Sequence, residues 1–93
     1  MTGIMNKPDP TTKAQRVAKW AKYFPGRHPA VHELMSYFST DHLPDGTPMK
    51  GLVSEFEAFA EELVNACPDG PELTTALRKI LEAKDCAVRS VVP

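Results

Sequence analysis

Two long amphipathic segments, joined by only a few residues, constrain this chain more than any other feature. In residues 48–67 and 70–91, apolar side chains recur at steps of three and four, which is the spacing of one helix face and not of a strand. The connection around Pro68 and Asp69 is so short that the second helix must return antiparallel to the first. The sequence therefore predicts an all-α fold built on an antiparallel two-helix hairpin.

Both hairpin helices have recognisable start signals. Thr47 is a predicted N-cap, and Pro48 follows it at the first helical position, where a missing N–H costs nothing. Asp69 and Glu72 have the spacing of a capping box, in which Asp69 accepts from the Glu72 N–H and the Glu72 carboxylate reaches back. These signals place the helix starts near residues 48 and 70.

Two shorter helices, about 12–24 and 29–38, are predicted ahead of the hairpin. Thr11 or Thr12 can cap the first, and His28 with Pro29 can begin the second. Residues 1–10 hold two prolines and a glycine and have no apolar core that would mark a secretion signal. We expect residues 1–10 to be a flexible tail and residues 11–93 to form a single helical domain.

The apolar stripes of the hairpin are broader than one neighbouring helix can cover. Phe56, Phe59 and Leu63 belong to the apolar stripe of the first hairpin helix. We expect the N-terminal helices and a second copy of the chain to share this surface, which makes the protein at least a homodimer. No stretch approaches the ~20 apolar residues of a membrane span, so we expect a cytoplasmic protein without a membrane partner.

Charge is divided unevenly along the chain. Residues 1–28 carry six basic and one acidic side chain, whereas residues 29–93 carry five basic and eleven acidic ones. The basic segment can bind an anionic partner, or it can pack against the acidic remainder of the same chain; both interpretations stay open. Since its aromatic residues follow a helical stripe that favours internal packing, we predict no nucleic-acid polymer as partner.

No motif in the sequence indicates an enzyme. Zinc motifs, a P-loop, a dinucleotide fingerprint and a nucleophile elbow are all absent. His28 and His32 could present two metal ligands from one helix turn, but no third ligand is evident. Asp41 and His42 are adjacent in a loop, with no nucleophile nearby. We therefore predict no catalytic residue, no metal and no cofactor, and we expect Cys67 and Cys86 to remain reduced because the hairpin separates them.

One set of residues could recognise a small anionic ligand with flat rings. Lys50 lies at a helix start, where free N–H groups favour an anion, and Thr75 and Arg78 lie near the start of the last helix. Rings and a hydroxyl come from the loop before the hairpin. The candidate ligand-binding residues are Phe38, Thr40, His42, Lys50, Thr75 and Arg78; taken alone, they also fit ordinary solvated surface.

Residues 38–92 resemble the helical hairpin domain of phage anti-CBASS cyclic-oligonucleotide sponges (the Acb/Tad group). The resemblance rests on Phe38, His42 and Pro44 in the loop, on the segment CPDGPE at 67–72, and on ALRK at 76–79 with LEA at 81–83. It implies a symmetric phage oligomer that sequesters cyclic di- or trinucleotides between protomers without cleaving them. Better-known members have a base-stacking tyrosine where this chain has Thr40.

Two functional hypotheses follow. The first is a phage-encoded counter-defence protein that sequesters cyclic oligonucleotides in the cytoplasm of the host bacterium. The alternative is a phage protein that binds and inactivates a host protein, such as a coiled-coil or cell-division component, through an amphipathic helical surface. The missing ring at Thr40 and the additional basic N-terminal helices motivate the alternative.

Overall fold

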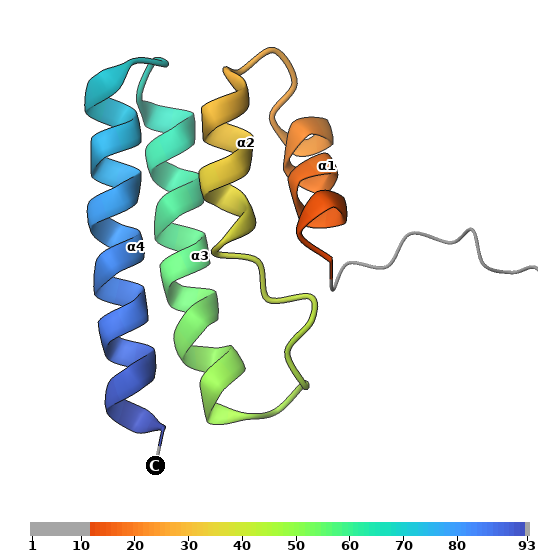
Figure 1. Ribbon diagram of the computed structural model, residues 1–93, viewed down its shortest axis with the longest axis vertical. Helices are drawn as coiled ribbons and strands as arrows, with labels where there is room; N and C mark the ends of the chain where they lie inside the picture. Colours follow the sequence, from red (N-terminus) through yellow and green to blue (C-terminus); the bar gives the residue numbers. More distant parts are fainter. Residues whose placement is uncertain (1–11, 93) are drawn as a thin grey trace, which may run out of the picture.

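A computed structural model describes residues 12–92 of the chain (Figure 1). Within that range every regular element is a helix: α1 (Lys13–Tyr23), α2 (Pro29–Ser36), α3 (Pro48–Ala66) and α4 (Pro71–Val91). The predicted all-α fold is confirmed, with α1 and α2 ending one and two residues before the predicted 24 and 38. The predicted tail, residues 1–10, lies outside the described residues.

Three of the predicted helix starts are capped by the expected side chains. The Thr12 hydroxyl accepts from the backbone N–H of Gln15 at 3.2 Å, and the Thr47 hydroxyl accepts from that of Lys50 at 3.2 Å. His28 caps α2 through its ring, whose Nδ1 accepts from the Ala30 N–H at 3.0 Å. Each side chain supplies an acceptor to a backbone donor that has no partner inside its own helix.

The predicted capping box at the start of α4 is wrong. Gly70 is the N-cap, and no side chain caps this helix. The Asp69 carboxylate accepts instead from Arg27 Nε and from the backbone N–H of His28, each at 2.7 Å. A charged guanidinium offers a carboxylate a stronger hydrogen bond than a backbone amide does, so Asp69 fastens the hairpin turn to the α1–α2 connection.

The four helices form a thin slab of 47 × 38 × 15 Å. The two hairpin helices lie antiparallel, α2 packs against both of them, and α1 packs against α2 (Figure 1). Because α2 is short, it covers mainly the half of the hairpin nearest the turn, and α1 lies beside α2 on the side away from α3 (Figure 1). We call the side of α3 and α4 that meets α2 and the 37–47 loop the inner face.

The core lies between the inner face and the N-terminal helices. It consists of Trp20, Phe24, Val31, Met35, Phe38, Ala60, Val64, Leu73 and Leu77. The Trp20 and Phe24 rings stack with centroids 5.7 Å apart, and the indole N–H donates to the Ser39 hydroxyl at 2.7 Å. Satisfying that donor allows the large Trp20 side chain to be almost fully buried.

Basic side chains of the N-terminal segment bind acidic side chains further along the chain. Lys13 pairs with Glu33 at 2.7 Å, Lys19 with Asp41, and Arg27 with Asp69. For these three cations, the interpretation that the basic segment packs against the chain's own acidic part is confirmed. At least part of the basic charge near the N-terminus therefore forms ion pairs with acidic residues of the same chain.

Candidate functional site

The loop residues of the predicted ligand site are largely committed to the core. Phe38 is fully buried, and Thr40 is 7% exposed. The Thr40 hydroxyl donates to Glu57 Oε1 at 3.4 Å, a long contact. Phe38 packs among the core residues, so its ring offers no surface on which a ligand base could stack.

Lys50 and His42 remain near the surface at the open end of the hairpin. Lys50 Nζ binds Asp45 Oδ1 at 2.6 Å, and this contact lowers the pKa of the Asp45 carboxyl. The pKa of the exposed His42 is also lowered, first by partial burial of its ring and then by the positive charge of Arg16. Lys50, which the sequence predicted to bind a ligand, is thus already paired with Asp45 of the preceding loop.

Thr75 and Arg78 lie far from the other candidates. Both are exposed, in the first two turns of α4. Lys50 is sixteen residues before the end of α3 and Thr75 is four after the start of α4, so the two are roughly 18 Å apart along the hairpin. One protomer therefore does not bring the six predicted residues together.

The two histidines considered as metal ligands have structural roles. His28 caps α2, and His32 is buried with Nε2 2.8 Å from the Phe24 carbonyl oxygen. Across residues 12–92, no three metal-ligating side chains lie together. Both cysteines are free, and no described helix is long and apolar enough to cross a membrane.

Glu57 is an acidic residue of α3 that lies on the inner face. It is half-buried beside Thr40, and its Oε2 is buried without a hydrogen-bond partner among the described atoms. Burial raises the pKa of Glu57, while the nearby Lys19 charge opposes that rise. The signal was present in the sequence, because Val53, Glu57, Ala60 and Val64 follow one another at steps of four, three and four.

The side of the hairpin turned away from α2 carries the half-exposed ring of Phe59 among small side chains and exposed carboxylates. Thr74 borders the start of α2, whereas Ala76, two residues later, points about 160° away from it. In the same way Glu57 faces Thr40, and Phe59 points about 160° away from Glu57. We define the outer hairpin face by its apolar residues Leu52, Phe59, Leu63, Ala76, Ile80 and Ala83. Leu63 and Ile80 also pack against the core. The exposed Glu55 and Glu72 lie on the same side, because they are two residues before Glu57 and Thr74.

Phe59 is the centre of this outer face. Its side chain is 51% exposed in the middle of a long helix, and the neighbouring Leu63 and Ile80 are only partly buried. The opposing positions on α4, Ala76 and Ala83, have small side chains. The surface is thus a ring beside a strip of alanines, a shape into which another helix can pack.

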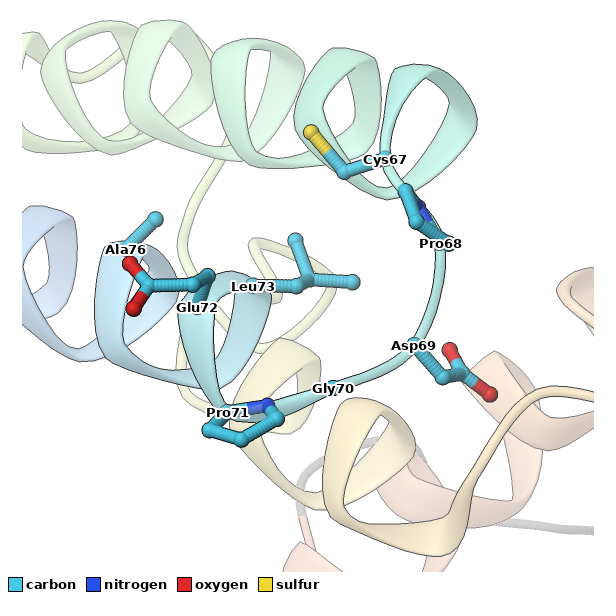
Figure 2. Close-up of a pocket in the computed structure, with 8 residues that line it drawn as sticks. All are labelled: Cys67, Pro68, Asp69, Gly70, Pro71, Glu72, Leu73 and Ala76. Carbon is cyan, nitrogen blue, oxygen red and sulfur yellow. The ribbon is translucent and has the colours of Figure 1, made fainter.

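A hollow at the hairpin turn continues the outer face. It has a volume of about 400 Å³ and is lined by residues 67–73 with Ala76. Figure 2 shows Cys67 and Leu73 on its walls, the Asp69 carboxylate turned away, and the Glu72 carboxylate pointing along α4 rather than back to the turn. The hollow and the outer hairpin face therefore meet at Ala76.

Comparison with known proteins gives this chain no relative. No family model matches it, and neither a curated protein nor a solved structure does.

Proposed function

We propose that this chain is a non-enzymatic protein-binding module that captures a helical segment of another protein on the outer hairpin face. The observation that supports the proposal is the half-exposed Phe59 ring in the middle of α3. An exposed aromatic ring of this kind is a typical anchor of a protein interface, because burying it removes a large apolar area from water.

The shape of the surface favours a helix as its target. Two antiparallel helices leave a shallow groove between them, and an amphipathic helix lays its apolar side into such a groove. Phe59 would form one wall of such a groove, and the small side chains of Ala76 and Ala83 would allow the bound backbone to come close. The setting that the family resemblance suggests is a phage protein acting on a host protein in the bacterial cytoplasm.

A capture experiment with matched variants tests this proposal. Immobilised wild-type protein, Phe59→Glu and Ala58→Glu are each exposed to a bacterial lysate. Ala58 is exposed beside Phe59 but points about 100° away from it, so both variants add the same charge to the same helix. We expect one stoichiometric helical protein to be retained by wild type and Ala58→Glu and lost with Phe59→Glu. Equal retention by all three, or by none, would refute the use of this face.

A second candidate function is sequestration of cyclic di- or trinucleotides. The observation that favours it is the exposure of Thr75 and Arg78 one helix turn apart, where a hydroxyl and a guanidinium could both reach a phosphate. Phe38 and Thr40 do not support it, since both are buried. Titration calorimetry with a panel of cyclic di- and trinucleotides tests it: binding that Arg78→Ala abolishes supports sequestration, and absence of heat with every ligand excludes it.

A further inference from the structure

We propose that the helix captured on the outer hairpin face is basic, with a lysine or arginine on either side of an apolar residue that meets Phe59. This inference rests on the proposed use of that face for protein binding and names the chemistry of the partner. Four exposed charged residues lie on the face: Glu55 and Glu62 from α3, and Glu72 and Lys79 from α4. None of the four belongs to an ion pair within residues 12–92.

The two glutamates of α3 lie on either side of Phe59. Glu55 is four residues before Phe59 and Glu62 is three residues after it, and these spacings place the three side chains in one row along the helix. Seven residues of helix separate the two carboxylates by roughly 10 Å along the axis. No residue three or four positions from either glutamate is basic, so α3 itself supplies no counter-ion for them.

The α4 side of the face carries charges of both signs. Glu72 is four residues before Ala76, and Lys79 is three residues after it, so both share the side of Ala76. Their charges are opposite, and this side therefore has no net charge. With the two glutamates of α3, the outer hairpin face carries three carboxylates and one ammonium group, and the excess of negative charge lies along α3.

This excess of negative charge selects the kind of partner. A second copy of the chain would bring a face of the same net negative charge, and an anionic membrane or a nucleic acid would bring phosphates; like charges across an interface are costly. A helix with cations seven residues apart presents them at the same roughly 10 Å spacing as the two α3 carboxylates. An apolar residue three or four positions after the first cation then lies between them and meets Phe59.

Two synthetic peptides of identical composition test the inference. Both are amphipathic helices of ~20 residues with a leucine stripe. In the first peptide two lysines lie seven residues apart beside the stripe, and in the second the same two lysines lie on the opposite side of the helix. Fluorescence anisotropy measures binding to the full chain. We expect the second peptide to bind about tenfold more weakly than the first, and added salt to reduce the difference.

Variants of the protein carry the same test to its own charges. Glu62→Lys changes the charge on the face, whereas Glu82→Lys makes the same change at an exposed residue that points about 100° away from Ala83. We expect Glu62→Lys to weaken binding of the first peptide by about tenfold and Glu82→Lys by less than about twofold. A third peptide, with glutamates in place of the two lysines, should bind the double variant Glu55→Lys, Glu62→Lys better than wild type. A folding defect could not produce that gain.

The outcomes separate this inference from the proposed function. Equal binding of the first two peptides, absence of binding by both, or equal weakening by Glu62→Lys and Glu82→Lys overturns the basic partner and does not affect target capture from the lysate. Binding as expected while the lysate experiment retains no protein supports the charge preference of the face and overturns the proposed capture.

Two further measurements test other occupants of the face. A wild-type dimer in sedimentation equilibrium that Phe59→Ala dissociates would assign the face to a second copy of the chain. Binding to phosphatidylglycerol vesicles that Phe59→Ala abolishes would assign it to a membrane surface. Either result overturns the basic helix as the partner, and so does binding of the first peptide that Phe59→Ala leaves unchanged.

Discussion

The inner and outer faces of the α3–α4 hairpin are built from the same two helices and end in opposite environments. On the inner face Val64 and Leu77 are fully buried beneath α2, whereas on the outer face Phe59 is 51% exposed. The difference lies in what the rest of the chain can reach. The helices α1 and α2 have 11 and 8 residues against 19 and 21 in the hairpin, so they can cover one face and not both. An apolar stripe thus indicates that a surface will be covered, but not by which chain.

The largest test of this contrast compares one substitution on each face. Leu77→Ala should cost about 2–5 kcal/mol of the free energy of unfolding, because a cavity remains in the core. Phe59→Ala should cost less than about 1 kcal/mol in dilute solution, where half of its ring is already in water. Urea denaturation at low protein concentration measures both. Similar losses at the two positions would mean that the outer face is packed in the monomer.

The second test concerns the residue that holds the covered part of the hairpin in place at its turn. Arg27 donates to Asp69 and to the backbone carbonyls of Val64 and Cys67, two acceptors at the end of α3. Arg27→Ala should destabilise the fold by about 2 kcal/mol, since hydrogen bonds to a charged donor are lost and partly buried carbonyls are left unpaired. Lys22→Ala, an exposed change on the neighbouring helix, is the control, and thermal unfolding is the measurement. A loss no greater than that of the control would show that the Arg27 contacts do not secure the turn.

The sequence predicted the helices well because helix starts and stripes are local signals. Thr47 with Pro48 marks a start that depends only on its own turn, and the step of three and four in α3 needs no knowledge of its neighbours. The capping box failed for the opposite reason. Asp69 had a local acceptor role available, but a guanidinium 42 positions earlier in the chain offered a better one.

The six residues of the predicted ligand site do not lie together, because the prediction grouped them by chemical type and did not consider the distances between them. Phe38 has the chemistry of a stacking ring, yet it follows α2 directly and continues the buried line of Val31 and Met35. Thr75 and Lys50 each lie near the start of a hairpin helix, but antiparallel helices start at opposite ends. Pairing the helix starts with the hairpin geometry would have separated these residues from the sequence alone.

The smallest expected effect comes from Glu57, a carboxylate that lies in the buried stripe of the inner face. Its pKa is raised in the folded protein, chiefly by burial, so folding favours the protonated form. The stability that this proton provides is complete below the ordinary pKa of about 4.5 and is lost as the pH rises through the folded pKa. Glu57→Gln keeps the shape without the charge and should therefore stabilise the protein at neutral pH by about 1 kcal/mol or less.

Urea denaturation of Glu57→Gln and wild type at several pH values measures this difference. The advantage of the variant should shrink as the pH falls towards 4.5, where the wild-type carboxyl is protonated as well. Glu62→Gln, the same change at an exposed position on α3, should show no such pH-dependent gain. A gain that persists at low pH would trace the effect to packing instead of charge. A loss of stability at neutral pH would mean that the Lys19 charge stabilises the Glu57 carboxylate by more than burial destabilises it. Glu57 would then stabilise the inner face through an ion interaction, although its Oε2 has no hydrogen-bond partner among the described atoms.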